Sequence, residues 1–128
     1  MIEKVIHIAR EAGEIIRDGF GRNFSVEFKT NASNLVTEID KKSENTIINY
    51  NHKNFPSHTI LAEESGKHFY GGEYLWVIDP LDGTTNFAHG LPIFSVSIGV
   101  VRNNETVAGV VYDVMNDKVY SAEKGSGA

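Results

Sequence analysis

The sequence contains no cysteine, and this absence excludes disulfides, zinc–thiolate sites and cysteine nucleophiles. It also has no long hydrophobic run, because no stretch approaches the roughly 20 apolar residues that a membrane-spanning helix needs. Met1 to Ile16 is interrupted by charged side chains, so it is not the core of a signal peptide. We therefore expect a protein of the cytoplasm without a membrane partner.

Positive charge is scarce as well. The chain has 12 Lys and Arg against 17 Asp and Glu, a formal net charge of −5, and no basic stripe. This balance argues against a nucleic-acid polymer as partner. What is present is ordinary for a globular protein: 128 residues, 41% hydrophobic and 23% charged, enough for one domain with a core.

The hydrophobic periodicity predicts an α+β fold with helices packed on one side of a largely antiparallel sheet. Residues 2–20 carry apolar side chains at three- and four-residue steps, which indicates an amphipathic helix. A second helix is expected after Leu35–Asp40, ended by the polar segment Asn49–His58. A loop is expected at Lys67–Glu73. Strands are predicted at Asn23–Lys29, Thr59–Ala62, Tyr74–Ile78, Ile93–Val101, Thr106–Val114 and Val119–Ala122.

The most informative stretch is Asp79–Asn86, DPLDGTTN, which follows the strand predicted at Tyr74–Ile78. Pro80 is predicted to end that strand because proline cannot donate to a sheet ladder, and Gly83 permits a tight turn. The residues after Gly83 suit the first turn of a helix, whose outward N–H groups form a site for an anion such as phosphate.

Two carboxylates, Asp79 and Asp82, stand three positions apart with the Leu81 carbonyl between them. These are hard oxygen donors suited to Mg²⁺, Ca²⁺ or Mn²⁺. The stretch thus offers a cation site beside a phosphate site. An Asx-rich turn that caps a helix is the alternative interpretation.

Further acids and one lysine are open to two interpretations on the residues alone. Asp40 is either a first-turn helix acid or a ligand. Glu63 and Glu64 come directly after a predicted strand, where open α/β sheets place ligands, but they also suit a charged turn. Lys29 would ordinarily be a solvated charge at a strand end.

The segments Trp76–Phe87 (WVIDPLDGTTNF) and His89–Gly99 (HGLPIFSVSIG), with Leu35–Asp40 (LVTEID) and Leu61–Gly66 (LAEESG), resemble the inositol monophosphatase family. This family belongs to a superfamily of metal-dependent, lithium-sensitive phosphatases. The resemblance covers nearly the whole chain and implies that residues 1–128 are the N-terminal portion of the layered α/β sandwich of sugar phosphatases. The family's second half, with a further metal-binding aspartate in a W-D-x-A-A-G-type motif, has no counterpart in this sequence.

The resemblance also implies a ligand set. Glu63, Asp79 and the Leu81 carbonyl would bind a first Mg²⁺, and Asp79 and Asp82 a second, with a third ion possible in the family's pattern. Mn²⁺ is an alternative ion, and Li⁺ is expected to inhibit.

Roles in catalysis follow from the same resemblance. Thr84 is expected to help Glu63 position and deprotonate the attacking water. The N–H groups of Gly83, Thr84 and Thr85 would bind the phosphate. An outer group is expected to comprise Asp40, Glu64 and Lys29.

The function that the resemblance implies is Mg²⁺-dependent hydrolysis of a small phosphorylated substrate such as myo-inositol monophosphate, by a homodimer. Alternatives in the superfamily are fructose-1,6-bisphosphatase, NADP phosphatase and 3′-nucleotidase activity. Alternatives of another class are a catalytically silent fragment that binds metal or phosphate, and an oligomer-forming fragment whose acids are structural. We expect the 128-residue chain alone to be slow or inactive, to expose apolar surface and to self-associate.

Overall fold

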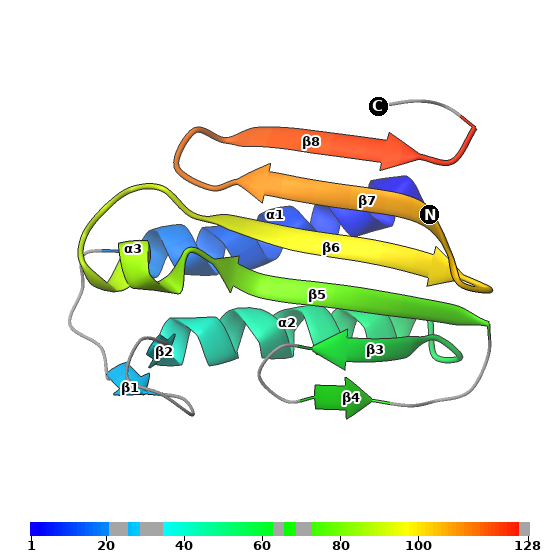
Figure 1. Cartoon of the computed structure of the whole chain (residues 1–128), viewed down its shortest axis with the longest axis horizontal. Coiled ribbons are helices and arrows are strands. Elements are labelled where there is room, and N and C mark those ends of the chain that lie inside the picture. Colours follow the sequence, from blue (N-terminus) through cyan, green and yellow to red (C-terminus); the bar gives the residue numbers. More distant parts are fainter. Residues whose placement is uncertain (21–25, 29–34, 63–65, 69–72, 126–128) are drawn as a thin grey trace.

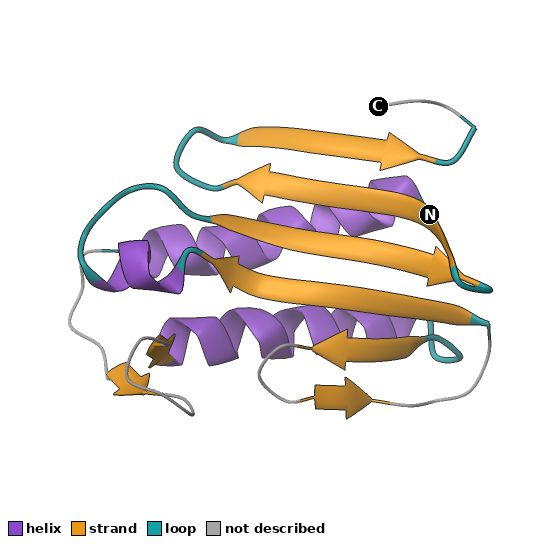
Figure 2. Cartoon of the chain, in the orientation of Figure 1, coloured by secondary structure: helices purple, strands orange, loops and turns teal. Residues whose placement is uncertain are grey.

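The computed structural model describes residues 1–20, 26–28, 35–62, 66–68 and 73–125, and it confirms an α+β fold (Figure 2). The helices are α1 (Ile2–Gly19), α2 (Glu38–Asn54) and the short α3 (Thr84–Ala88). The strands are β1 (Val26–Phe28), β2 (Leu35–Thr37), β3 (Thr59–Ala62), β4 (Gly66–His68), β5 (Tyr74–Asp82), β6 (Ser95–Arg102), β7 (Glu105–Asp113) and β8 (Lys118–Glu123).

Strands β3 to β8 form one sheet in the order β4-β3-β5-β6-β7-β8, while β1 and β2 pair separately. Within the larger sheet β3 and β5 are parallel and the other neighbouring pairs are antiparallel. Helices α1 and α2 lie side by side across one face of this sheet, as predicted (Figure 1). We call this the helix face, and the opposite side the outer face.

The core lies between the helices and the helix face. Every second residue of β6 and β7 points into it, which follows from the two-residue period of a strand. Buried side chains from these two strands are Val96, Ile98, Val100, Ala108, Val110 and Tyr112. The alternation predicted for β6 is therefore confirmed.

One polar junction fastens α1 to β7. Arg17 donates from Nη2 to the Tyr112 hydroxyl at 2.6 Å and to the Val114 carbonyl at 2.8 Å. The Tyr112 hydroxyl in turn donates to Asp117 at 2.7 Å. The Tyr112 ring lies against Gly13 of α1, where a β-carbon would overlap it. A small helix residue thus lets the strand's largest side chain pack close to the helix backbone.

Two sequence predictions are wrong, one on the end of α2 and one on the segment that follows β3. Residues 49–54 continue α2, although the polar segment Asn49–His58 was expected to end the helix, and His52 is accordingly helical. The fully buried Asn51 and the half-buried Tyr50 show that this turn packs inward, and packing outweighs weak local propensity. The loop expected at Lys67–Glu73 is wrong at Lys67 and His68, which belong to β4 beside β3, and residues 69–72 lie outside the described residues.

Of the strand predicted at Asn23–Lys29, only Val26–Phe28 falls among the described residues, and these form β1. In the described part of the chain, none of the helices has the length and apolar character to cross a bilayer.

His58 is the centre of an aromatic cluster at the end of the sheet where β5 begins. Its ring stacks between Phe55 and Tyr74, with centroids 4.9 and 4.5 Å away. Its Nδ1 accepts a hydrogen bond of 3.0 Å from Nε1 of Trp76, so the neutral ring carries its proton on Nε2. Burial lowers the pKa of His58. The cations of Lys4 and Arg102 lie over the Phe55 and Tyr74 rings, each 5.5 Å from a centroid.

We predict that this cluster makes stability depend on pH. In the unfolded chain His58 binds a proton below about pH 6.5, whereas the folded protein keeps the ring neutral to a lower pH. The contribution of His58 to the free energy of unfolding is therefore fully present above the pKa of the unfolded chain. It falls as the pH drops from about 6.5 toward the pKa of the folded protein. Urea unfolding followed by fluorescence of Trp76, the sole tryptophan, should show the midpoint falling from pH 8 to pH 5.

The variant His58→Gln should flatten this pH dependence, since glutamine offers Trp76 an acceptor and does not titrate. His7→Gln, on the exposed side of α1, is the matched control and should keep the wild-type slope. An equal slope in wild type and His58→Gln would contradict the role of His58.

Candidate functional site

The chain turns a corner at residues 79–85, between β5 and α3, and a β-bulge shapes that corner. Asp79 pairs with Ser97 and Asp82 with Ser95, so β5 advances three residues while β6 advances two. In a regular strand, residues three apart point to opposite faces. The one extra residue cancels that alternation and brings the Asp79 and Asp82 side chains to the same face. The helix-facing residue opposite the bulge is the buried Val96, so the shared face is the outer one.

The prediction that β5 ends at Pro80 is wrong, because the strand continues to Asp82. Pro80 lies within the interval where the register shifts, so its missing N–H removes no regular ladder bond there. Pro80 and Leu81 are buried while Asp82 is exposed. The Pro80 carbonyl accepts a hydrogen bond of 2.8 Å from the Ser43 hydroxyl of α2. The bulge thus anchors the corner in the core and leaves a carboxylate outside.

Gly83 makes the turn into α3, as the sequence predicted. Its φ of 97° and ψ of 32° lie in the left-handed region, which glycine adopts without strain. A β-carbon at this position would also lie 2.9 Å from the Ile93 carbonyl oxygen and 3.2 Å from the Phe94 β-carbon. Two independent constraints therefore require glycine here.

Thr84, the first residue of α3, connects the corner to α2. Its hydroxyl lies 3.0 Å from the Leu81 carbonyl oxygen and 3.3 Å from Oδ2 of Asp40. One hydroxyl carries one proton, so it donates to these two acceptors in turn. Asp40 is buried, which places a carboxylate behind Thr84 rather than in solvent.

Aromatic packing holds the short helix α3 in place. The rings of Phe20, Phe87 and Phe94 form a triangle with centroid separations of 5.7, 5.1 and 5.2 Å. Asn86 donates from its side chain to the Ile93 carbonyl at 3.0 Å, and its own carbonyl accepts from the Leu91 N–H at 2.8 Å. These contacts fix a helix too short to be stable by itself.

The described part of the structure brings most of the predicted site residues close to one another, and three of them lie outside it. Those at or beside the corner are Asp79, Leu81, Asp82, Gly83, Thr84, Thr85 and, through Thr84, Asp40. Lys29, Glu63 and Glu64 lie outside the described residues. Ala62, the last described residue before Glu63, pairs with Ile78, so β3 ends level with the start of the corner.

The described corner offers oxygen donors of the kind that divalent cations prefer: two carboxylates on one face and a carbonyl between them. Across the described residues alone, however, no three His, Asp or Glu side chains gather closely enough to hold a metal ion.

Sequence reasoning did not identify Ser43, which lies three residues after Asp40 on the same face of α2. Asp40, Ser43 and Glu44 are all buried, although helix positions that face a core are normally apolar. Three polar residues at i, i+3 and i+4 were the available signal, because that spacing places them together on the helix surface. Two of them, Asp40 and Ser43, contact the corner.

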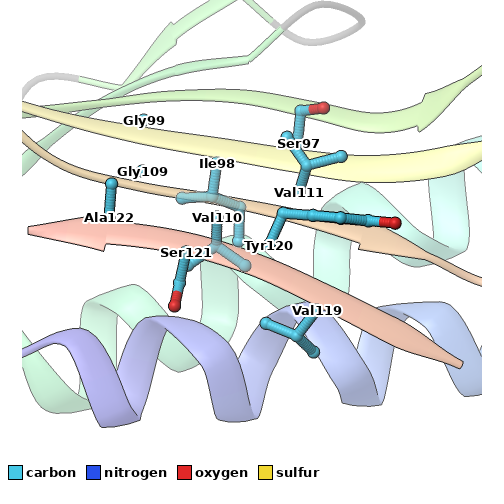
Figure 3. A pocket seen from close by; sticks show the side chains of 10 residues that line it. All are labelled: Ser97, Ile98, Gly99, Gly109, Val110, Val111, Val119, Tyr120, Ser121 and Ala122. Carbon is cyan, nitrogen blue, oxygen red and sulfur yellow. The ribbon is translucent and has the colours of Figure 1, made fainter. Parts of the chain in front are cut away.

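A shallow groove, lined mainly by apolar residues, runs over β6, β7 and β8 (Figure 3). One hollow of about 390 Å³ borders Asp82 and Gly83, and a second of about 670 Å³ runs over β6, β7 and β8. The two hollows share Val111 and Tyr120, which are 42% and 59% exposed. The candidate site thus lies at one end of an exposed, largely uncharged surface.

Comparison with known proteins identifies close relatives. The sequence model of the inositol monophosphatase family matches residues 1–128. The chain is 45% identical to Nus factor SuhB of Pasteurella multocida (strain Pm70), over 100% of this chain and 49% of that protein. It is 40% identical to inositol monophosphatase 1 of Sus scrofa, over 99% and 47%, and 44% identical to fructose-1,6-bisphosphatase/inositol-1-monophosphatase of Thermotoga maritima, over 96% and 47%. The chain spans about half the length of these curated relatives.

Solved structures show the same fold as this chain. The extragenic suppressor protein SuhB from Bartonella henselae superimposes with a TM-score of 0.92 at 38% identity, over 98% of this chain and 49% of that chain. A structure described as an IMPase/NADP phosphatase complexed with Mg²⁺ and phosphate gives a TM-score of 0.84 at 25% identity, over 96% and 47%. A related one holds NADP and Ca²⁺.

We predict that Gly83→Ala destabilises the corner more than Gly90→Ala does. Both glycines have positive φ, so alanine costs about 1–2 kcal/mol of unfolding free energy at either position. A β-carbon at Gly90 meets nothing within 4 Å, whereas one at Gly83 overlaps backbone. Urea unfolding of the two variants measures the difference, and equal losses would show that the contact with Ile93 relaxes without strain.

Proposed function

Because this chain belongs to the inositol monophosphatase family, we propose that it carries the metal-binding and phosphate-binding part of a phosphoric monoester hydrolase. The observation that carries the proposal is the bulge that sets Asp79 and Asp82 on one face, next to Thr84 and the turn at Gly83. A helix-capping turn would need neither the second carboxylate on that face nor the buried acid behind Thr84.

The donors fit a hard divalent cation. Asp79, the Leu81 carbonyl and Glu63 are proposed to hold one Mg²⁺, and Asp79 and Asp82 a second, with Mn²⁺ as an alternative ion. When bound, such ions supply electrostatic stabilisation of the transferring phosphoryl group and a more acidic water. The relatives solved with Mg²⁺ and phosphate, and with NADP and Ca²⁺, support this choice of ion.

The chain's own residues then have separate tasks. Glu63 accepts a proton from the attacking water, and Thr84 orients that water while its hydroxyl is held between the Leu81 carbonyl and Asp40. The backbone N–H groups of Gly83, Thr84 and Thr85 donate to the phosphate oxygens. Water displaces the alcohol at phosphorus directly, so no residue needs to form a covalent intermediate.

Glu64 and Lys29 are proposed as outer groups that hydrogen-bond around the ligands. The homodimer, the cytoplasmic location and the inhibition by lithium expected from the sequence stay predictions.

The proposed substrate is a small phosphorylated molecule, with myo-inositol monophosphate first. Fructose 1,6-bisphosphate, NADP and a nucleotide 3′-phosphate follow as alternatives, since relatives are named for fructose-1,6-bisphosphatase and NADP phosphatase activity. A chimera of this chain with the remaining half of a relative is given each of the four compounds at equal concentration in Mg²⁺. The rates of phosphate release then rank the substrates. The rival function is a silent fragment that binds metal or phosphate without turnover.

We predict that Asp82→Asn removes most activity from a chimera of this chain with the remaining half of a relative. The amide keeps the shape of the exposed side chain but loses the negative charge that a cation needs, so turnover should fall by at least about 100-fold. Phosphate release at saturating Mg²⁺ measures the loss.

Asp113→Asn is the matched control, because it makes the same change on the outer face, on β7. It should lose far less activity than Asp82→Asn. If Asp82→Asn stays within a few-fold of the unmutated chimera, Asp82 does not belong to the site.

We predict that the 128-residue chain by itself releases phosphate slowly or not at all and self-associates. Its described residues offer the second ion only Asp79 and Asp82, and Mg²⁺ gives up water reluctantly to an incomplete ligand set. Its outer face exposes Val77, Val111 and Tyr120. Phosphate release in Mg²⁺ and sedimentation velocity, on material free of host phosphatase, test both parts.

Adding the remaining half of a relative as a separate chain should restore turnover and reduce self-association. Robust turnover by the purified 128-residue chain would show instead that no further ligand is required.

A further inference from the structure

The bulge places two consecutive peptide carbonyls where the regular β5–β6 register is broken, and a side-chain hydroxyl serves each of them. The Leu81 carbonyl accepts from Thr84, and the Pro80 carbonyl accepts from Ser43 at 2.8 Å. The two hydroxyls come from different elements, α3 and α2. Ser43 is fully buried and Pro80 is buried, so this second bond is made away from solvent.

We propose that Ser43 is a positioning residue for the Asp79–Asp82 corner, an inference that rests on the proposed metal-dependent function. The Pro80 carbonyl lies in the same rigid peptide plane as the Leu81 nitrogen, so fixing the oxygen fixes that plane. The next plane carries the Leu81 carbonyl, which Thr84 holds. With both peptide planes fixed, the Leu81 carbonyl oxygen and the backbone that carries the Asp82 side chain keep a constant orientation relative to Asp79.

A serine at this position needs such an explanation. The α2 helix presents Ile47 and Ile48 to the core one turn later, and an apolar residue at position 43 would avoid the cost of burying a hydroxyl. It would, however, remove the donor of the hydrogen bond to the buried Pro80 carbonyl. Ser43 instead gives a hydrogen bond to a residue 37 positions away, inside the stretch that holds the candidate ligands. Its action is on the geometry of the oxygen donors, since its hydroxyl is turned to the Pro80 carbonyl on the helix side of the corner.

The test compares Ser43→Ala, Ser43→Thr and Thr46→Ala in the 128-residue chain. Thr46→Ala is the matched control, because Thr46 lies on the same helix and donates to the Lys42 carbonyl, away from the corner. Mn²⁺ is the probe, and its free concentration is followed by electron paramagnetic resonance. Hydrogen exchange of peptides covering residues 79–88 reports the corner without any metal.

We expect Ser43→Ala to weaken Mn²⁺ affinity about 10-fold, the loss typical of removing a group that orients a ligand. It should also speed exchange over residues 79–88. Ser43→Thr, which keeps the hydroxyl, should recover most of the affinity, and Thr46→Ala should match the wild type in both measurements.

The outcomes separate this inference from the proposed function. Loss of thermal stability in Ser43→Ala with unchanged Mn²⁺ affinity and unchanged exchange would overturn the positioning role and leave Ser43 as a structural residue. If the wild type binds no Mn²⁺, the proposal that Glu63, Asp79 and the Leu81 carbonyl of this chain hold the first ion fails. Exchange then decides the positioning role: faster exchange in Ser43→Ala, but not in Thr46→Ala, supports it, and equal exchange overturns it.

Discussion

The single extra residue that β5 inserts against β6 is the constraint on which the candidate site depends. It turns two acids that a regular strand would place on opposite faces into a pair on the outer face. It also puts proline where no ladder donor is needed, and it presents the Pro80 and Leu81 carbonyls to hydroxyls of α2 and α3. Ligand geometry, strand continuation and the start of α3 therefore follow from one local irregularity.

The character of α2 follows from that irregularity. A helix that only covered a sheet would bury an apolar stripe, and α1 does so with Val5, Ile8, Ala12 and Ile16. The first half of α2 instead buries Asp40, Ser43 and Glu44. Burying polar groups costs free energy unless they are hydrogen-bonded, and two of these three contact the corner. The helix thus combines a supporting function in its first turns with ordinary core packing at Ile47 and Ile48.

The parts of the fold that the sequence predicted correctly depend on short-range periodicity. Apolar side chains alternate at Val96, Ile98 and Val100, and they recur at three- and four-residue steps in α1. Both patterns arise because one side of the element packs against the core. The extension of β5 through Pro80 was missed because it depends on a register shift against β6, which local propensity does not contain.

The continuation of α2 to Asn54 was missed for a related reason, since the turn is anchored by tertiary packing of the buried Asn51, and its asparagines are weak helix formers. For the candidate site, the sequence could nominate Asp79, Asp82, Gly83 and Thr84, because their residue types and spacing suit cation and phosphate binding. Ser43 was not, because its role lies in a contact 37 residues away.

The position of the candidate site on the outer face links the proposed cation binding to whatever covers that face. Asp79 and Asp82 lie on this face, and Asp82 borders one of its hollows. The same face exposes the apolar side chains of Val77, Val111 and Tyr120. Covering the groove gains hydrophobic free energy but also draws two carboxylates toward a medium of low dielectric constant, where unneutralised charge is costly. A divalent cation removes that penalty, and low dielectric strengthens its attraction to the carboxylates. Covering of the groove should therefore strengthen cation binding, and a bound cation should make covering of the groove more favourable.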